Sequence, residues 1–144
     1  MTSPARDHAD AQRLLLQLAR FGSTVSNAMA DATGQPEFVT NAPLLVLCLL
    51  DLEGPERPGA IGEVVGLTSG GTTKLLDRME TAGLINRSYG AIEADHRGVQ
   101  VTLTAEGRRL LRIATGSLIE HLPETTGMLK EVVALLESLE ASGA

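Results

Sequence analysis

Cysteine is almost absent from this sequence, Cys48 being the only one. A single thiol can form neither an intramolecular disulfide nor a cysteine-rich metal site, and this usage is typical of a reducing compartment. The three histidines, His8, His96 and His121, lack the paired spacing of metal ligands. We therefore expect no metal and no cofactor, and the cytoplasm is the default location.

Long apolar runs are also lacking. The longest, Leu44 to Leu50, is far too short to cross a bilayer, and no basic and apolar leader opens the chain. We therefore expect no membrane partner. No arrangement of serine, histidine and aspartate or of paired carboxylates stands on a recognisable catalytic framework, so we do not expect an enzyme.

Positive charge is scarce, because the 144 residues carry a net charge of −6. Proteins that coat nucleic acid by charge alone rely on a broad basic surface, so the net charge counts against this class. With 43% hydrophobic residues the chain is long enough for one globular domain with a real core. Any DNA binding must therefore be local and depend on geometry.

One stretch has the pattern of a helix that presents its N-terminal end to a partner. Residues 67–80 read LTSGGTTKLLDRME, where Thr68 can cap the first turn and Leu75, Leu76 and Met79 form an apolar stripe at helical spacing. The residues between the cap and the stripe are small or polar. Such a tip suits phosphates and base edges.

Two successive glycines, Gly70 and Gly71, follow this cap. Each costs about 1 kcal/mol relative to alanine inside a helix. They are either tolerated because the first turn is forgiving, or present so that another backbone can approach closely. A phosphate-binding P-loop does not fit, because the GxxxxGK[ST] spacing and a preceding buried strand are absent.

The residues around this stretch predict a winged helix-turn-helix. A short buried helix with Asn41 as its cap is expected over 43–51, and a second over 58–65 leads through Gly66 into the polar helix. Gly83 should end that helix in a left-handed cap. The segments 84–88 and 99–103 then read as two antiparallel strands, which form the wing.

Long amphipathic helices are predicted at both ends of the chain. Residues 8–33 carry an apolar seam, Thr104 can cap a helix that ends near Pro123, and 124–139 carry a second seam at spacings of three and four. These seams exceed what a small winged core needs to cover itself. We therefore expect an obligate homodimer; the alternative is a helical layer within a monomer.

The predicted fold class is mainly α with a small β-hairpin wing (α+β). A single chain, 1–144, would hold a winged helix-turn-helix DNA-binding region over 41–104 and a helical dimerisation layer formed by 8–33 and 104–142.

This order of elements and two motifs resemble the MarR family of bacterial transcription regulators, which are dimeric winged helix-turn-helix proteins often released from DNA by small ligands. The segment LTSGGTTKLLDRMETAGLI, residues 67–85, is similar to the family's recognition helix and its exit into the wing. The segment DHRGVQVTLTAEG, residues 95–107, is similar to its wing signature.

The resemblance implies a set of DNA-binding residues. Arg78 would lie near the phosphates, Arg97 would contact the minor groove from the wing, and Arg87 is either a phosphate contact or a solvated strand residue. Asp95 would support the wing loop, since a carboxylate facing phosphates is repelled. The full expected set is Thr68, Ser69, Gly70, Gly71, Thr72, Thr73, Lys74, Arg78, Arg87 and Arg97.

The implied partners are a pseudo-palindromic double-stranded operator, a second copy of the chain, and a small apolar or phenolic effector. Two departures from the family pattern bear on these. Aromatic residues are only 2% of the chain, so an effector pocket would be mainly aliphatic. His96 stands where a second wing arginine is usual, which reduces the fixed positive charge there.

Three hypotheses follow. The first is a homodimeric, sequence-specific regulator that represses a nearby operon. The second is a winged-helix dimer that binds a ligand or a protein through its helical layer without reading DNA, because acids and bases are equal in number over 68–104. The third is a redox switch at Cys48, which its apolar surroundings disfavour because burial raises the pKa of a thiol.

Overall fold

The computed structural model describes residues 4–89 and 98–143. This part of the chain is mainly helical, with one antiparallel hairpin, which confirms the predicted fold class. Its elements are α1 (Pro4–Thr33), the short 3-10 helix η1 (Pro36–Phe38), α2 (Asn41–Glu53), α3 (Pro58–Val65), α4 (Ser69–Thr81), β1 (Ile85–Tyr89), β2 (Val99–Leu103), α5 (Ala105–Glu120) and α6 (Leu122–Ala141).

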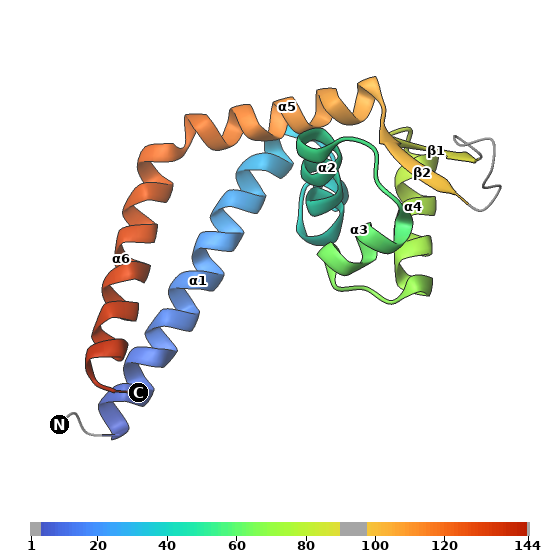
Figure 1. Ribbon diagram of the computed structural model, residues 1–144. Helices are drawn as coiled ribbons and strands as arrows, with labels where there is room; N and C mark the ends of the chain where they lie inside the picture. The colour runs from blue at the N-terminus through green and yellow to red at the C-terminus, as the bar shows by residue number, and fades with distance from the viewer. Residues whose placement is uncertain (1–3, 90–97, 144) are drawn as a thin grey trace.

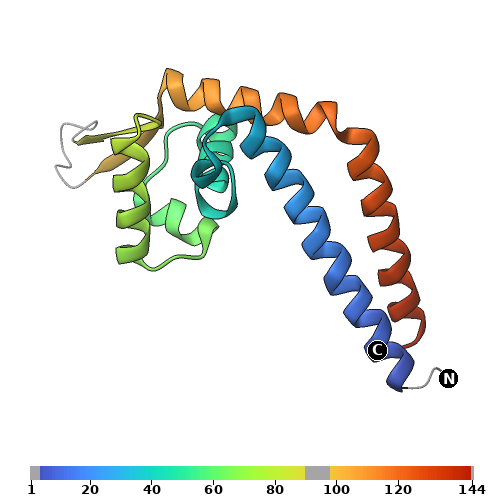
Figure 2. The ribbon, with the colours of Figure 1, turned by 180° about the vertical axis from the view of Figure 1, so that it is seen from behind.

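The elements form two regions. We call α1 and α6, which run side by side, the arm, and α2, α3, α4 and the hairpin the lobe (Figure 1). Helix α5 crosses from the lobe to the arm, and the start of α1 lies near the end of α6 at the far end of the arm (Figure 2). The N-terminal tip of α4 lies on the side of the lobe away from α5.

The core lies in the lobe and under the first half of α5. The apolar stripe predicted for α4 is buried there, because its spacing places all its members on the face turned toward α2, α3 and the hairpin. The side chains that are entirely or almost entirely enclosed are Val39, Val46, Leu47, Ile61, Leu76, Met79, Leu84, Ile85, Val101 and Leu110.

The hairpin pairs β1 with β2 in the register Ile85 to Leu103 through Tyr89 to Val99. Strand β1 begins one residue later than predicted because the N–H of Leu84 donates to Met79 O at 3.0 Å, so that Leu84 still belongs to the cap of α4. The preceding Gly83 has the left-handed conformation predicted for it. A bridge between Glu56 and Val101 attaches the α2–α3 loop to the hairpin.

The start of α2 was predicted wrongly. Thr40, not Asn41, is the N-cap of α2, and Asn41 is already the first helical residue. Helix α5 ends at Glu120, close to the predicted end near Pro123, and Pro123 itself lies in the first turn of α6, where a helix tolerates proline because the N–H has no intrahelical partner. Helix α3, in contrast, spans the predicted residues. No helix in 4–89 or 98–143 is long and apolar enough to cross a membrane.

Candidate nucleic-acid interface

The turn between α3 and α4 sets the two helices close together. Gly66 ends α3 in the left-handed conformation, which glycine adopts without steric cost, and the N–H of Leu67 donates back to Gly62 O at 3.1 Å. Thr72 of α4 packs on α3 at Gly62. Two short helices joined by such a turn are a helix-turn-helix.

Thr68 caps the recognition helix, as the sequence predicted. Its Oγ1 accepts from the N–H of Gly71 at 3.1 Å, and its carbonyl accepts from the N–H of Thr72 at 2.8 Å. The N–H groups of Ser69 and Gly70 lie in the first turn, where no preceding turn of the helix offers them a carbonyl acceptor, so they are directed out of the tip. Together with the positive end of the helix dipole, these groups favour an anion at this position.

The outward face of α4 is narrow and polar. Ser69, Gly70, Thr73 and Lys74 are exposed on the first two turns, and Arg78 follows one turn later. A Cβ at Gly70 would meet nothing within 4 Å, so the surface there is low and open. The Thr73 hydroxyl donates to Ser69 O at 2.9 Å, which leaves its lone pairs for an outside donor. The tip can thus contact both phosphates and base edges.

Thr72 does not belong to this face. Its side chain is only 3% exposed, and its hydroxyl donates to Thr68 O at 2.9 Å. The expectation that Thr72 contacts DNA does not fit this burial, because Thr72 lies one turn before the stripe at Leu75, Leu76 and Met79 and turns inward with it. Gly71 is half-buried, and its N–H is already used by the cap.

Arg87 on β1 is held by two carboxylates of α4. Its guanidinium donates to Asp77 Oδ1 at 2.5 Å and to Glu80 Oε2 at 2.6 and 2.8 Å, and its backbone N–H donates to Glu80 Oε1 at 3.1 Å. The Arg87 side chain is only 18% exposed. These bonds, which we call the Arg87 clamp, fasten the wing strand to the recognition helix.

The clamp changes the electrostatics of the interface. The side-chain hydrogen bond from Arg87, followed by its backbone hydrogen bond, holds the pKa of Glu80 below its ordinary value, while Asp77 and then Glu80 raise the pKa of Arg87. The single guanidinium charge offsets only one of the two carboxylate charges, so the clamp stays net negative. The cations left on the outward face of α4 are Lys74 and Arg78, neither of which forms an ion pair with another described residue.

Sequence reasoning missed the clamp. The signal was present as two acids, Asp77 and Glu80, one turn apart on α4, followed by a base on the strand that returns beside the helix. The contact between the helix and this strand exists only in the folded chain. Whether Arg87 contacts phosphate stays a prediction, and its guanidinium would have to leave two carboxylates to do so.

The tip of the wing lies outside the described residues, and with it Asp95, His96 and Arg97. The described part of the hairpin ends at Tyr89, whose ring is 72% exposed. Tyr89 is one of three aromatic residues in the chain. Its exposure beside the wing tip adds an aromatic side chain to this edge of the interface.

The chemistry of the other candidate residues is limited. Burial, and after it the charge of Asp51, raise the pKa of the Cys48 thiol, which lowers its reactivity toward oxidants and weakens the redox hypothesis. Within residues 4–89 and 98–143 no group of three His, Cys, Asp or Glu side chains could hold a metal ion.

Known proteins share this arrangement. The sequence model of the MarR family matches residues 39–91, which include α2, α3, α4 and β1. The match covers little more than a third of the chain. The family resemblance seen in the sequence is therefore confirmed.

The chain is also similar to a curated protein, the uncharacterized HTH-type transcriptional regulator YfiV of Bacillus subtilis (strain 168). It is 39% identical over 67 residues, which are 46% of this chain and 41% of YfiV. The match therefore spans less than half the length of that relative.

Two solved structures show a likeness in fold over nearly the whole chain. The crystal structure of RV1404 from Mycobacterium tuberculosis has a TM-score of 0.67 at 23% identity, over 99% of this chain and 94% of that one. A mutant MarR from E. coli, crystallised in complex with operator DNA, has a TM-score of 0.62 at 23% identity, over 90% and 92%. At these identities the likeness shows the winged-helix fold.

Proposed function

We propose that this protein is a cytoplasmic, homodimeric transcription regulator that binds a specific double-stranded DNA sequence. The observation that carries the proposal is the capped tip of α4, with Ser69, Gly70, Thr73 and Lys74 exposed on a MarR-family domain. Such a tip offers backbone N–H groups to a phosphate and short polar side chains to base edges. The protein acts as a repressor of a nearby operon.

Each part of the interface has a proposed task. The first two turns of α4 enter the major groove, and Lys74 and Arg78 contact phosphates on its walls. The Arg87 clamp holds the wing strand against α4, so that Arg97, carried over from the family's wing, reaches the minor groove. Asp95 supports the wing loop. Because the chain has a net charge of −6, these few contacts and their geometry supply the affinity.

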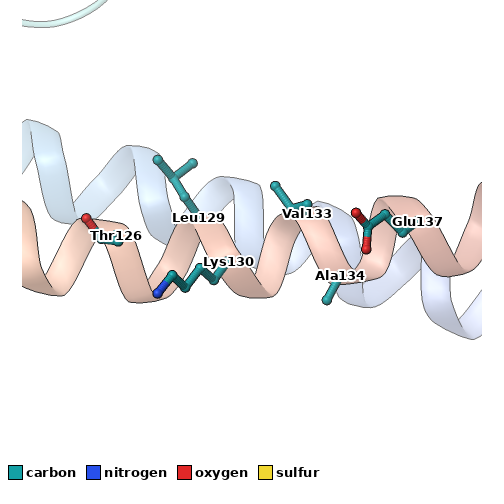
Figure 3. A pocket seen from close by; sticks show the side chains of 6 residues that line it. All are labelled: Thr126, Leu129, Lys130, Val133, Ala134 and Glu137. Carbon is teal, nitrogen blue, oxygen red and sulfur yellow. The ribbon is translucent and has the colours of Figure 1, made fainter.

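The homodimer is supported by apolar side chains that the single chain leaves uncovered on the arm. Helix α6 carries a shallow groove of about 320 Å³ whose six lining residues, among them Leu129 and Val133, all lie on α6 (Figure 3). These two side chains are 44% and 50% exposed. A second copy would cover them, as the interfaces of permanent dimers are rich in apolar side chains.

Helix α1 supplies further uncovered apolar surface. Leu15, Leu16 and Leu18 are 68%, 56% and 45% exposed. Pairing of two arms about a two-fold axis would bury these leucines and the α6 groove together. The same pairing would place two copies of α4 in successive major grooves, about 34 to 36 Å apart. The operator would then be a pseudo-palindrome.

A small effector would release the dimer from DNA. The family resemblance suggests an apolar or phenolic compound, yet the cleft of about 380 Å³ between α1 and α6 is lined mostly by polar side chains, such as Arg20, Glu124 and Glu131. This cleft suits a polar ligand better. A panel of small phenolic, aliphatic and amino acids added to a preformed DNA complex tests which class causes release.

The experiment that tests the proposal starts with selection of random duplexes on the purified protein, followed by mobility shifts at two salt concentrations. We expect one enriched palindromic motif. Lys74→Ala should weaken its binding by about ten-fold or more and lower the salt slope by about two, because each protomer loses one phosphate contact. Arg112→Ala, at an exposed cation on α5, is the matched control and should change neither, because α5 and the tip of α4 lie on opposite sides of the lobe (Figure 1).

A second candidate function is an interaction module that does not read DNA. It is favoured by the Arg87 clamp, which engages one of the four bases of 68–104 with acids of the same region. Selection that enriches no motif, from a protein that sediments as a dimer, would overturn DNA reading and leave this alternative.

A further inference from the structure

The exit of the recognition helix is fastened directly to the start of α5. The N–H of Thr104 donates to Leu84 O at 3.1 Å, and the Thr104 hydroxyl donates to Gly83 O at 2.6 Å. The same Oγ1 accepts from the N–H of Gly107 at 3.0 Å. One threonine therefore caps α5 and at the same time bonds the turn that leaves α4. We call these four residues, Gly83, Leu84, Thr104 and Gly107, the α4–α5 junction.

The junction has no free space. A Cβ at Gly107 would overlap the carbonyl oxygen of Leu84 and come within 2.7 Å of Leu103 Cδ1. The Leu84 carbonyl cannot retreat without stretching its bond from Thr104, and the Leu84 side chain is fully buried. Only glycine lets the first turn of α5 lie directly on this backbone. The angle between α4 and α5 is therefore set by close contact rather than by a flexible loop.

The other half of α5 is attached to the arm. Ser117, 6% exposed, donates from its Oγ to Ala28 O of α1 at 3.0 Å, and Ala114 is fully enclosed beside it. Helix α5 has 16 residues, a length of roughly 24 Å. It thus acts as a strut that holds the arm at one half and the exit of α4 at the other, as Figure 2 shows.

We propose that the α4–α5 junction sets the spacing between the two operator half-sites that this protein accepts. The inference rests on the proposed function, because it needs a dimer that reads DNA with two copies of α4. In such a dimer the arm determines the position of the two-fold axis, and α5 is fixed relative to the arm. The junction then fixes the orientation of α4 relative to α5, and so relative to the axis. Thr104 and Gly107 are positioning residues, since neither lies on the outward face of α4.

The test uses the half-site found by selection. One series of duplexes carries two copies of this half-site, separated by the preferred spacing or by a spacing one or two base pairs longer or shorter. A further duplex carries a single half-site. Wild-type protein should bind best at one spacing. Gly107→Ala should lose about ten-fold or more at that spacing while its affinity for the single half-site stays within about two-fold, so that the spacing profile flattens or shifts.

Four further variants keep the test decisive. Thr104→Val, which removes the hydroxyl but keeps the shape of the side chain, should flatten the spacing profile as well. Thr104→Ser, which keeps the hydroxyl, should have the spacing profile of the wild type. Gly116→Ala is the matched control on the same helix, because a Cβ there would meet nothing within 4 Å. Thr115→Val is the control for the valine, since Thr115 is exposed and bonds only within α5.

The outcomes separate the inference from the proposed function. An equal loss at every spacing and at the single half-site, or an unchanged profile in both Gly107→Ala and Thr104→Val, would overturn the role of the junction while leaving the regulator in place. A wild-type protein that selects no half-site would overturn the proposed function, and the inference with it.

Discussion

The lobe and the arm differ in how far one chain can bury its own apolar side chains. Each of the 13-residue helices α2 and α4 has four buried residues. The arm helix α1 has one buried residue in 30, and α6 has two in 20. Leucines that would form a core in the lobe are exposed on the arm. The lobe is therefore complete within one chain, whereas the arm has the composition of one half of an interface.

The largest expected effect is on the dimer interface of the arm. Val133→Asp on α6 should raise the dissociation constant of the dimer by about a thousand-fold, or about 4 kcal/mol, because the interface would bury an unpaired carboxylate from each protomer. Sedimentation equilibrium measures the constant. Val64→Asp on α3 is the matched control, since Val64 and Val133 are 52% and 50% exposed. Equal constants for both variants would contradict an interface on α6.

The second effect breaks the lobe. Leu76→Ala removes a side chain that is 1% exposed and should lower the free energy of unfolding by about 3 kcal/mol, through lost burial and the cavity left behind. Urea titration measures it. Leu52→Ala, at a leucine that is 80% exposed, should stay within about 0.5 kcal/mol of wild type. A smaller loss for Leu76 than for Leu52 would mean that the lobe core lies elsewhere.

A third prediction sharpens the comparison at the tip of the lobe. Thr68→Ala should cost about 1 kcal/mol of unfolding free energy, because the N–H of Gly71 loses its acceptor. Thr73→Ala is the control, because this exposed threonine bonds only to the helix carbonyl of Ser69. Thermal unfolding of both variants gives the difference, and a Thr73 variant as unstable as the Thr68 variant would argue against the cap.

The smallest effect concerns pH. Because Arg87 holds the pKa of Glu80 below its ordinary 4.5, Glu80 stabilises the fold above that pH, and the contribution is lost as pH falls through its lowered pKa. Glu80→Gln should therefore lose less stability than wild type between about pH 5 and about pH 3. Urea titrations at both pH values measure this. In an Arg87→Gln background the same change should have no effect, and a persisting difference would rule out the clamp as its source.

Much of the lobe could be predicted from local pattern. The cap at Thr68, the glycine turn at Gly66 and the span of α3 each depend on residues within one or two turns of one another, so periodicity and capping chemistry suffice. The errors arose where neighbouring residues compete for one role. Thr40 and Asn41 are both residue types that cap helices well. The N–H of Leu84 bonds to the last turn of α4, so the strand begins only at the next residue.

The order of the elements and the polar character of the recognition helix could be known before folding, because both follow from side-chain type at regular spacing. Which polar residues face outward depended on the folded chain. In the folded chain Thr72 is buried between the two helices of the helix-turn-helix, and Arg87 forms hydrogen bonds with Asp77 and Glu80. It also brought Thr104 onto the exit of α4, more than 20 residues earlier in the chain. Contacts between distant segments depend on how whole elements pack, and no local pattern encodes that.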